Sequence, residues 1–420
     1  MKKGSRRRCR VNGLRFATIV VALLTIGTSL LVSLAYLPSS SAAADVKIAL
    51  IVPLSGRYAR QGQLKKMGAE MAIDEINASG GVKALGGANI ALVTADAGDT
   101  VEKAVSAAQR VLTREKVVAG IGAWLSSFTL GITEVSERLH IPWVTLSYAD
   151  PITERGYRYV FQSSPVAGIQ ATRALDLVVD LAKANGRTLK TAALVGDTTA
   201  TSVAFLRPLK DKLLPAKGIS VVVDESWSPP LADATPIAQK LRSAKPDIVF
   251  YGGINFPDSA LFLQKVKEFG LAMPIVGVGA QMVSPEFLDV VGKDLVNNVM
   301  AAVASHPIRG QEALIEKFKK RTGEKFMTQD PLSTYANVWI IKEALERARS
   351  ADPTAVRDAL AALDLTSGPA ASSLAPGRIR FDERGRRVGA TPIIAQWQGG
   401  EPVTVFPAEL ATHKPAWPWH

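Results

Sequence analysis

The residues that most often carry out chemistry in proteins are few and scattered in this chain. The four histidines are far apart in sequence: His140, His306, His413 and His420. Cys9 is the only cysteine, which excludes a disulfide framework and a thiolate zinc site. The neighbouring carboxylates of Asp74 and Glu75 fall in a helical pattern, where a solvated helix face explains them better than acid–base catalysis. The pattern predicts no metal site and no cofactor.

The sequence also lacks the short motifs of several enzyme classes. No G-x-x-x-x-G-K-[ST] phosphate loop, G-x-S-x-G, H-E-x-x-H or EF-hand pattern occurs. LSGRYARQG follows the first predicted strand, where a dinucleotide-binding fold has G-x-G-x-x-G. Because catalytic groups can assemble in space without a motif, an enzyme stays open as the least supported alternative. The basic residues are dispersed and not interleaved with aromatic ones, so we expect no nucleic-acid partner.

The positive charge of the chain is concentrated at its N-terminus. The formal net charge is +12, but residues 1–44 hold seven basic side chains and no acidic one, which leaves 43 basic against 38 acidic residues over 45–420. A basic head, an apolar stretch over 16–37 and small residues at Ala42 and Ala44 predict a signal peptide at 1–44, cleaved before Asp45, and a periplasmic protein. The alternative is an uncleaved membrane anchor.

The rest of the chain alternates short apolar strands with longer helical patterns, which indicates βαβ units and parallel sheets. The series begins with a strand at 46–54 and a helix at 61–81, and it restarts near 162–165. The second series includes a helix predicted over 205–218, and the stretch 377–406 predicts a hairpin. We therefore predict an α/β fold with two doubly wound parallel-sheet lobes. Ligands bind beyond the carboxyl ends of parallel strands, so two facing lobes would form a cleft.

Several stretches resemble a known family. They are VKIALIVPLSGRYARQGQ, GAEMAIDEINASGGV, TADAGDTVEKAVSAAQRVLTREKVVAGIGAWLSS, HIPWVTLSYADP, PDIVFYGGINFPDSA and GLAMPIVGVGA. Together they resemble the periplasmic solute-binding proteins of the branched-chain amino acid type (leucine-binding-protein-like), which are receptors of ABC importers. The likeness covers nearly all of residues 45–400.

The resemblance implies a type I periplasmic-binding fold, in which three crossing strands form a hinge between two lobes that close on a ligand. Lobe I would comprise 45–164 and 301–378, lobe II 165–300 and 379–406, and a tail 407–420 that either docks on a lobe or is disordered. It further implies a monomer that is not an enzyme and that has ABC permease subunits as partners. A periplasmic sensor with the same fold is an alternative.

The family holds a ligand carboxylate at a helix start and at the end of the next strand. The matching residues are Ser126 with Ser127, and Ser147, Tyr148 and Ala149. A helix N-terminus presents unpaired N–H groups and about half a positive charge, and charge-assisted hydrogen bonds are worth about 1.5–3 kcal/mol each. The alternative for Ser126 is a plain helix N-cap.

The departures from the family concern the other end of the ligand. Amino acid receptors of the family hold the ligand's ammonium with an acidic side chain at about the position of Gly279. In this chain Gly279 has no side chain, and its neighbours Val278, Ala280 and Gln281 carry no charge either. Gln61 and Thr201 stand where the family usually has aromatic residues. A buried ammonium without a carboxylate costs several kcal/mol. The sequence therefore favours a carboxylate without an α-amino group, with branched-chain or other amino acids as the alternative.

Aromatic residues lie in or near the loops that would form the pocket. They are Tyr58, Trp124, Tyr148, Phe161 and Phe256, with Asn255 beside the last. We expect an aromatic or keto acid to stack on these rings. The alternative for Trp124 and Phe161 is a place in the core of a lobe.

Overall fold

The computed structural model describes residues 1, 44–297 and 299–417. The chain divides into two compact units, Met1–Ala42 and Ala43–His420, and the description below concerns the second. The predicted signal peptide lies, apart from Met1 and Ala44, outside the described residues. Within those residues, no helix combines the length and the apolar character that crossing a membrane requires.

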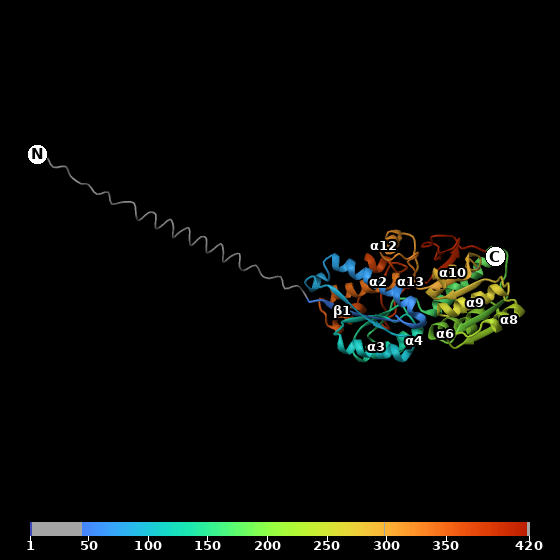
Figure 1. Cartoon of the computed structure of the whole chain (residues 1–420), viewed down its shortest axis with the longest axis horizontal. Coiled ribbons are helices and arrows are strands. Elements are labelled where there is room, and N and C mark those ends of the chain that lie inside the picture. The colour runs from blue at the N-terminus through green and yellow to red at the C-terminus, as the bar shows by residue number, and fades with distance from the viewer. Residues whose placement is uncertain (2–43, 298, 418–420) are drawn as a thin grey trace. The chain divides into compact units, whose positions relative to one another are not determined.

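The first lobe is built on a five-stranded parallel sheet with the order β2-β1-β3-β4-β5 (Figure 1). Its strands are β1 (Val46–Val52), β2 (Ile90–Asp96), β3 (Ala119–Gly122), β4 (Trp143–Thr145) and β5 (Val160–Gln162). Its helices are α2 (Ala59–Ala78), α3 (Val101–Arg114), α4 (Ser126–Arg138), α12 (Glu312–Thr322), α13 (Gln329–Ala348), α14 (Pro353–Ala361) and α15 (Gly368–Ser372). Every residue of β1 except Lys47 is buried, as expected of a strand covered on both faces.

The second lobe is built on a seven-stranded sheet with the order β14-β13-β10-β9-β8-β6-β7. Its strands are β6 (Thr191–Asp197), β7 (Ser220–Trp227), β8 (Ile248–Gly252), β9 (Ile275–Val278), β10 (Val299–Val303), β13 (Ile393–Gln398) and β14 (Glu401–Phe406). Its helices are α5 (Ala167–Ala184), α6 (Ala200–Pro208), α7 (Leu214–Ala216), α8 (Thr235–Ala244), α9 (Phe256–Glu268), α10 (Glu286–Val291) and α11 (Lys293–Val296). The last two strands pair antiparallel, as the predicted hairpin requires.

The chain passes between the lobes more than once. It enters the second lobe after β5, returns to the first after β10, where α13 packs on α2, and re-enters the second before β13. A short sheet of β11 (Asp364–Leu365) and β12 (Ile379–Arg380) precedes the last crossing. Two parallel-sheet lobes with this connectivity confirm the predicted fold class. The predicted boundary at residue 300 falls inside β10, whose strand pairs with β9 of the second lobe.

One predicted helix is interrupted. The pattern over 205–218 indicates a single helix, but the structure has α6, a π-helical turn at Leu209–Leu213 and then α7. Pro208 lies inside α6 and has no N–H to donate, so the regular hydrogen-bond ladder cannot continue through it. A wider π turn is a known way for a helix to absorb such a defect.

The described part of the tail, 407–417, docks on the second lobe. The N–H groups of Thr412 and His413 both donate to the Thr404 carbonyl, at 3.0 and 3.1 Å. The side chain of Gln396 exchanges two hydrogen bonds with the backbone of Ala416. Of the two outcomes considered for the tail, docking is the one that these residues adopt.

Candidate functional site

The predicted site residues come together where strand ends of the two lobes face each other. In the first lobe they follow η1 (Gly56–Tyr58), β3 and β4, and in the second they follow β6, β8 and β9. The hydroxyl of Thr201 donates to Ser126 Oγ at 2.9 Å, and the Ala200 N–H donates to Ser127 Oγ at 3.3 Å. The starts of α4 and α6, which are far apart in sequence, therefore meet directly.

Ser126 does not act as a helix cap. The helix α4 begins at Ser126 itself, with Leu125 at the N-cap position and no side-chain cap. The buried Ser126 Oγ instead accepts the N–H groups of Tyr148 and Ala149, each at 3.1 Å. Two backbone donors and the Thr201 hydroxyl thus converge on one oxygen at the positive end of a helix.

The loop before α4 holds an unusual backbone. Trp124 has a φ of 94°, a conformation that costs free energy for a residue with a side chain and that occurs most often at functional sites. Ser147 Oγ donates to the Trp124 carbonyl at 2.9 Å and is 2.7 Å from Thr129 Oγ1. The Trp124 ring lies 5.5 Å from that of Tyr58 within a cluster of buried apolar side chains. These contacts hold the loop in its strained form.

Tyr148 links the site to a crossing between the lobes. Its hydroxyl donates to Gln329 Oε1, the first residue of α13, and the N–H of Ala304 donates to the same oxygen at 2.6 Å. Ala304 directly follows β10, where the chain returns to the first lobe. Burial raises the pKa of the Tyr148 phenol, so the hydroxyl remains a donor at physiological pH.

Three predicted residues contribute buried amides to the site, Gln281 and Asn255 from the second lobe and Gln61 from the first. Gln281 Nε2 donates to the carbonyls of Gly253 and Val278, both at 2.7 Å. Asn255 caps α9, its Oδ1 accepting the Asp258 N–H at 2.9 Å. Gln61, in the first turn of α2, is 1% exposed, and neither of its amide atoms has a partner.

Gly279 occupies a position that only glycine fits. Its φ is 99°, and a Cβ built there would lie 2.4 Å from Gln281 Oε1. A side chain of any kind, including the acidic one that amino acid receptors carry nearby, is therefore excluded while Gln281 keeps this conformation.

The predicted aromatic residues differ in position. Phe161 is buried in the core of the first lobe, with its ring 5.2 Å from that of Phe381. Phe256 is half-buried and packs on Phe287 at 4.7 Å. Tyr58 and Trp124 form a ring pair at the first lobe's side of the site. Of these residues, only Tyr58 and Trp124 both contact another aromatic ring and lie beside α4, the helix that begins at Ser126.

Sequence reasoning missed two buried acids at the second lobe's side. Asp197 ends β6 and accepts the N–H and hydroxyl of Thr199 and, at 2.8 Å, the N–H of Ile254. Burial raises the pKa of Asp197 to about 6. Asp258 accepts Trp227 Nε1–H at 2.9 Å. The signal for Asp197 was an acid at the end of the buried strand TAALVGD, at the edge where ligands bind.

These acids lie close to the Tyr58 loop of the first lobe. The segment η1 packs against α9. Burial, followed by the negative charge of Asp197 and then a smaller contribution from Asp258, raises the pKa of Tyr58 to about 12. Both oxygens of Asp197 are already used to join the turns after β6 and β8, so its role is structural. Asp258 has a single described hydrogen bond to its carboxylate.

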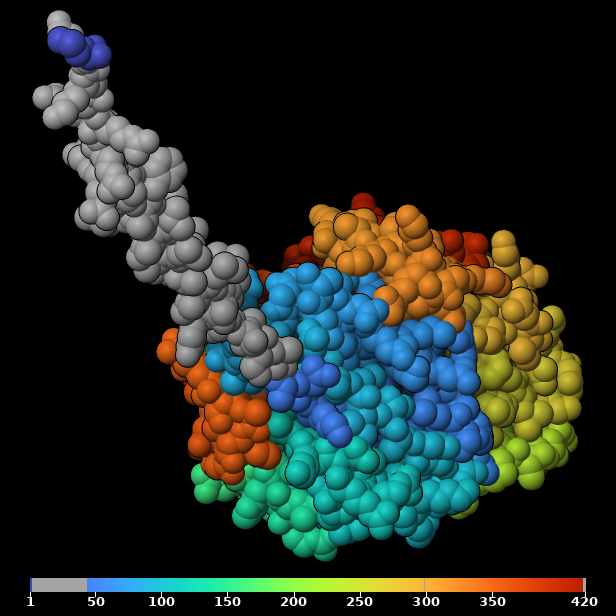
Figure 2. Space-filling view, turned by 60° about the vertical axis from the view of Figure 1, so that its left-hand side comes forward, coloured from blue at the N-terminus to red at the C-terminus, as the bar shows by residue number. Residues whose placement is uncertain are grey.

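A charged contact also joins the lobes. Arg60, in the first turn of α2, donates to Glu286 of α10 at 2.6 Å and makes two hydrogen bonds to Glu324, at 2.9 and 2.6 Å. Glu324 belongs to the first lobe and Glu286 to the second. In Figure 2 the blue atoms of the first lobe abut the yellow atoms of the second. Arg60 thus bridges the two lobes, and its ion pair with Glu286 can form only while the lobes are in contact.

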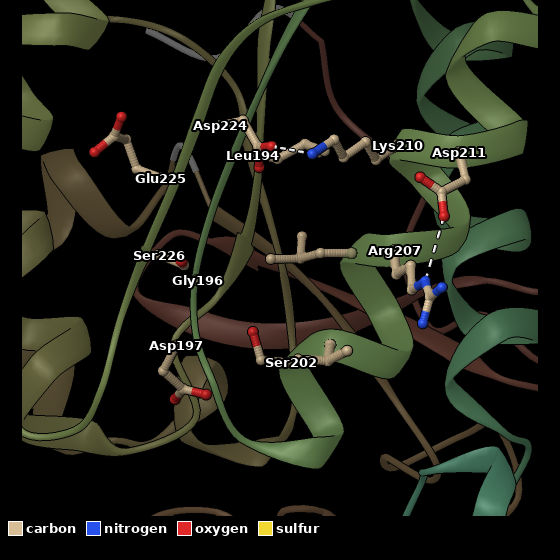
Figure 3. A pocket seen from close by; sticks show the side chains of 12 residues that line it. Leu194, Gly196, Asp197, Ser202, Arg207, Lys210, Asp211, Asp224, Glu225 and Ser226 are labelled. Carbon is tan, nitrogen blue, oxygen red and sulfur yellow. Dashed lines mark hydrogen bonds and ion pairs between the residues drawn. The ribbon is translucent and has the colours of Figure 1, made fainter.

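A separate pocket of about 370 Å³ lies on the second lobe between α6 and β7. Figure 3 shows its rim, where Lys210 pairs with Asp224 at 2.5 Å and Arg207 with Asp211 at 3.3 Å. None of the predicted site residues line it. Glu225 pairs with Lys240, and Asp197 binds the N–H groups of Thr199 and Ile254.

Comparison with known proteins places this geometry in a broader context. The family described as periplasmic binding protein matches residues 45–401. The Leu/Ile/Val-binding protein homolog 7 of Brucella suis biovar 1 is 31% identical over 386 residues, covering 89% of this chain and 94% of the relative. Homolog 8 of Brucella melitensis biotype 1 is 30% identical over 404 residues, covering 93% and 98%.

Two solved structures show the same fold. The leucine binding protein LivK from Thermotoga maritima has a TM-score of 0.74 at 22% identity, covering 86% of this chain and 97% of its own. A solute binding protein from R. palustris, solved in complex with benzoate, has a TM-score of 0.71 at 20% identity, covering 86% and 95%. Proteins of this fold thus include one bound to an aromatic carboxylate.

Proposed function

Since the chain belongs to the periplasmic binding protein family, we propose that it is the extracytoplasmic receptor of an ABC importer, which captures a small carboxylate between its lobes and delivers it to membrane permease subunits. The observation that carries this proposal is the meeting of two helix starts at Ser126, where neutral donors from both lobes converge. Such donors hold an anion without a cationic side chain. A ligand that contacts both lobes favours the state in which they touch.

The ligand that we infer is a carboxylate without an α-amino group, with aromatic acids preferred and keto acids next. Residues 278–281 carry no charge, and a side chain at Gly279 would collide with Gln281 Oε1 in its present conformation. The buried polar groups on this side include the amides of Asn255 and Gln281, besides the carboxylates of Asp197 and Asp258. An ammonium ion would lose its hydration here without a carboxylate from this strand end. The ring pair of Tyr58 and Trp124 supports an aromatic body for the ligand.

One observation favours an α-amino acid as a second candidate. Asp258 is buried, lies at the start of α9 beside the Tyr58 loop, and uses its carboxylate for one described hydrogen bond. It is the acid best placed to pair with an ammonium. The relatives named as Leu/Ile/Val-binding homologs agree with this candidate.

Isothermal titration separates the two candidates. The full chain is expressed for export and purified without added solutes, and it is titrated with benzoate, phenylpyruvate and leucine. We expect benzoate or phenylpyruvate to bind and leucine not to bind. Tight leucine binding that is lost in Asp258→Asn would contradict the carboxylate proposal and support the amino acid candidate. The intact mass of the exported protein tests cleavage before Asp45, since removal of residues 1–44 changes it by a calculable amount.

A further inference from the structure

On the second lobe's side of the site, opposite Ser126, two buried amides have atoms without a hydrogen-bond partner. Asn255 and Gln281 are 1% and 0% exposed, and Asn255 Nδ2 and Gln281 Oε1 have no hydrogen-bond partner. A buried polar group without a partner typically costs about 1–3 kcal/mol. One explanation for such a group at a candidate binding site is a ligand that completes it.

The orientation of both amides is determined by their other hydrogen bonds. Gln281 contacts two backbone carbonyls, and only an amide NH₂ can donate to both, so the free atom is the carbonyl oxygen. Asn255 accepts a backbone N–H from Asp258, which requires its carbonyl oxygen, so the free atom is the NH₂ group. The protein therefore presents one fixed acceptor and one fixed donor.

The two amides belong to the same edge of one sheet. The strands β8 and β9 are parallel neighbours, and Asn255 and Gln281 follow their carboxyl ends. Gln281 binds the carbonyl of Gly253, two residues before Asn255, which joins the two turns directly. The edge faces the first lobe, because α9, which Asn255 caps, packs against η1.

We propose that Asn255 and Gln281 select a carboxylate that carries a neutral hydroxyl group at its far end, as in the hydroxybenzoates. This inference rests on the proposed function and specifies its ligand class. A hydroxyl group both donates and accepts, so it matches the acceptor Gln281 Oε1 and the donor Asn255 Nδ2. A second carboxylate would face the Gln281 oxygen without a proton to share. A hydrogen atom at the same position leaves both amides unpaired.

The test is a titration series with benzoate, 3-hydroxybenzoate, 4-hydroxybenzoate and 4-methoxybenzoate. We expect at least one hydroxybenzoate to bind about tenfold to a hundredfold more tightly than benzoate, since two hydrogen bonds are gained and two buried groups are satisfied. The methoxy compound accepts but cannot donate, so it should not share this gain. Gln281→Met should reduce the preference for the hydroxyl to less than about threefold.

Two further variants separate recognition from folding. Asn255→Ser keeps an N-cap oxygen for α9 but removes the amide donor, and it should also reduce the hydroxyl preference. Gln396→Met removes a buried glutamine whose amide is bound to Ala416 of the tail, so it should keep the preference at the wild-type value. Thermal melting of each variant shows whether it is folded.

The outcomes distinguish the two levels of the argument. Equal affinity for benzoate and both hydroxybenzoates in the wild type overturns the hydroxyl inference and leaves the carboxylate receptor intact. A hydroxyl preference that persists in Gln281→Met and Asn255→Ser also overturns the assignment of these amides. Binding of leucine with no response to any aromatic or keto acid overturns the proposed ligand class and the hydroxyl inference with it.

Discussion

Replacing Glu286 with glutamine tests whether the charged bridge stabilises contact between the lobes. The substitution removes the negative charge of Glu286, which pairs with Arg60 across the lobes, and it leaves the two hydrogen bonds of Arg60 to Glu324 in the first lobe. The side chains of Arg60 and Glu286 are 30% and 35% exposed, so the pair is partly screened by water. Exposed pairs of this kind contribute at most about 1 kcal/mol. A loss of about 0.5–1 kcal/mol changes the ratio of touching to separated lobes by about two- to fivefold.

The ratio is measurable as a distance between the lobes. With Cys9, the only cysteine, replaced by serine, new cysteines at the exposed positions Glu102 of α3 and Ser243 of α8 each accept a nitroxide label. Pulsed electron–electron double resonance on the ligand-free protein then gives the populations of short and long distances between the two labels. We expect Glu286→Gln to shift population from the short distance to the long one by the stated factor. High salt should produce a similar shift in the wild type, because it screens the pair.

The control is an ion pair of the same kind that lies within one lobe. Arg321 of α12 pairs with Asp74 of α2 at 2.6 Å, and both belong to the first lobe. Asp74→Asn should leave the distance distribution unchanged. An unchanged distribution in Glu286→Gln, or an equal shift in Asp74→Asn, would refute the reasoning that this bridge acts between the lobes.

Three other substitutions have calculable effects. Burial lowers the pKa of His306 to about 3. Below pH 6.5 the unfolded chain therefore takes up a proton that the folded chain does not, and the free energy of unfolding should fall by about 2 kcal/mol from pH 6.5 to 4.5. His306→Gln should abolish this pH-dependent component, measured by urea titration at each pH. Ser126→Ala should weaken carboxylate binding about tenfold by calorimetry, whereas Ser136→Ala in the same helix, whose hydroxyl donates only to a backbone carbonyl, should not. Lys65→Met leaves the buried carboxylate of Asp330 without its ion-pair partner and should lower the free energy of unfolding by about 3–5 kcal/mol, measured in urea at pH 7.

The fold was predictable because its signals are local. Continuous apolar strands such as β1 and amphipathic helices such as α3, with Ala104, Ala107, Val111 and Leu112 on its buried face, are visible in short windows of sequence. The interruption after α6 was not predicted, because the hydrophobic spacing continues through Pro208 although the hydrogen-bond ladder does not. The assignment of β10 to the second sheet depends on its pairing with β9, which no local pattern reveals.

The location of the candidate site stays a prediction, and the structure adds the contacts that its residues make. Ligand-binding turns follow parallel strands, so residues such as Ser126 and Asn255 can be located once the strands are known. Their hydrogen-bond partners cannot, since Thr201 and Ser126 are 75 residues apart and Arg60 and Glu286 are 226 apart. The free atom of an amide is decided only by what its other atom binds. Asp197 was missed because an acidic residue at the end of a strand has the same sequence pattern whether its carboxylate oxygens are free or accept hydrogen bonds from the backbone.

The electrostatics of the two facing helix starts also predict which lobe would hold the proposed carboxylate. No acidic residue lies in the first turn of α4, so its partial positive charge meets only the hydroxyls of Ser126 and Ser127. At the start of α6, Asp197 binds the N–H and hydroxyl of Thr199, the N-cap residue, and already supplies a negative group. A ligand carboxylate is therefore attracted to α4 and repelled by Asp197. If the ligand is the proposed carboxylate, this asymmetry would place its charged end toward the first lobe and leave the neutral amides of the second lobe to contact the remainder of the molecule.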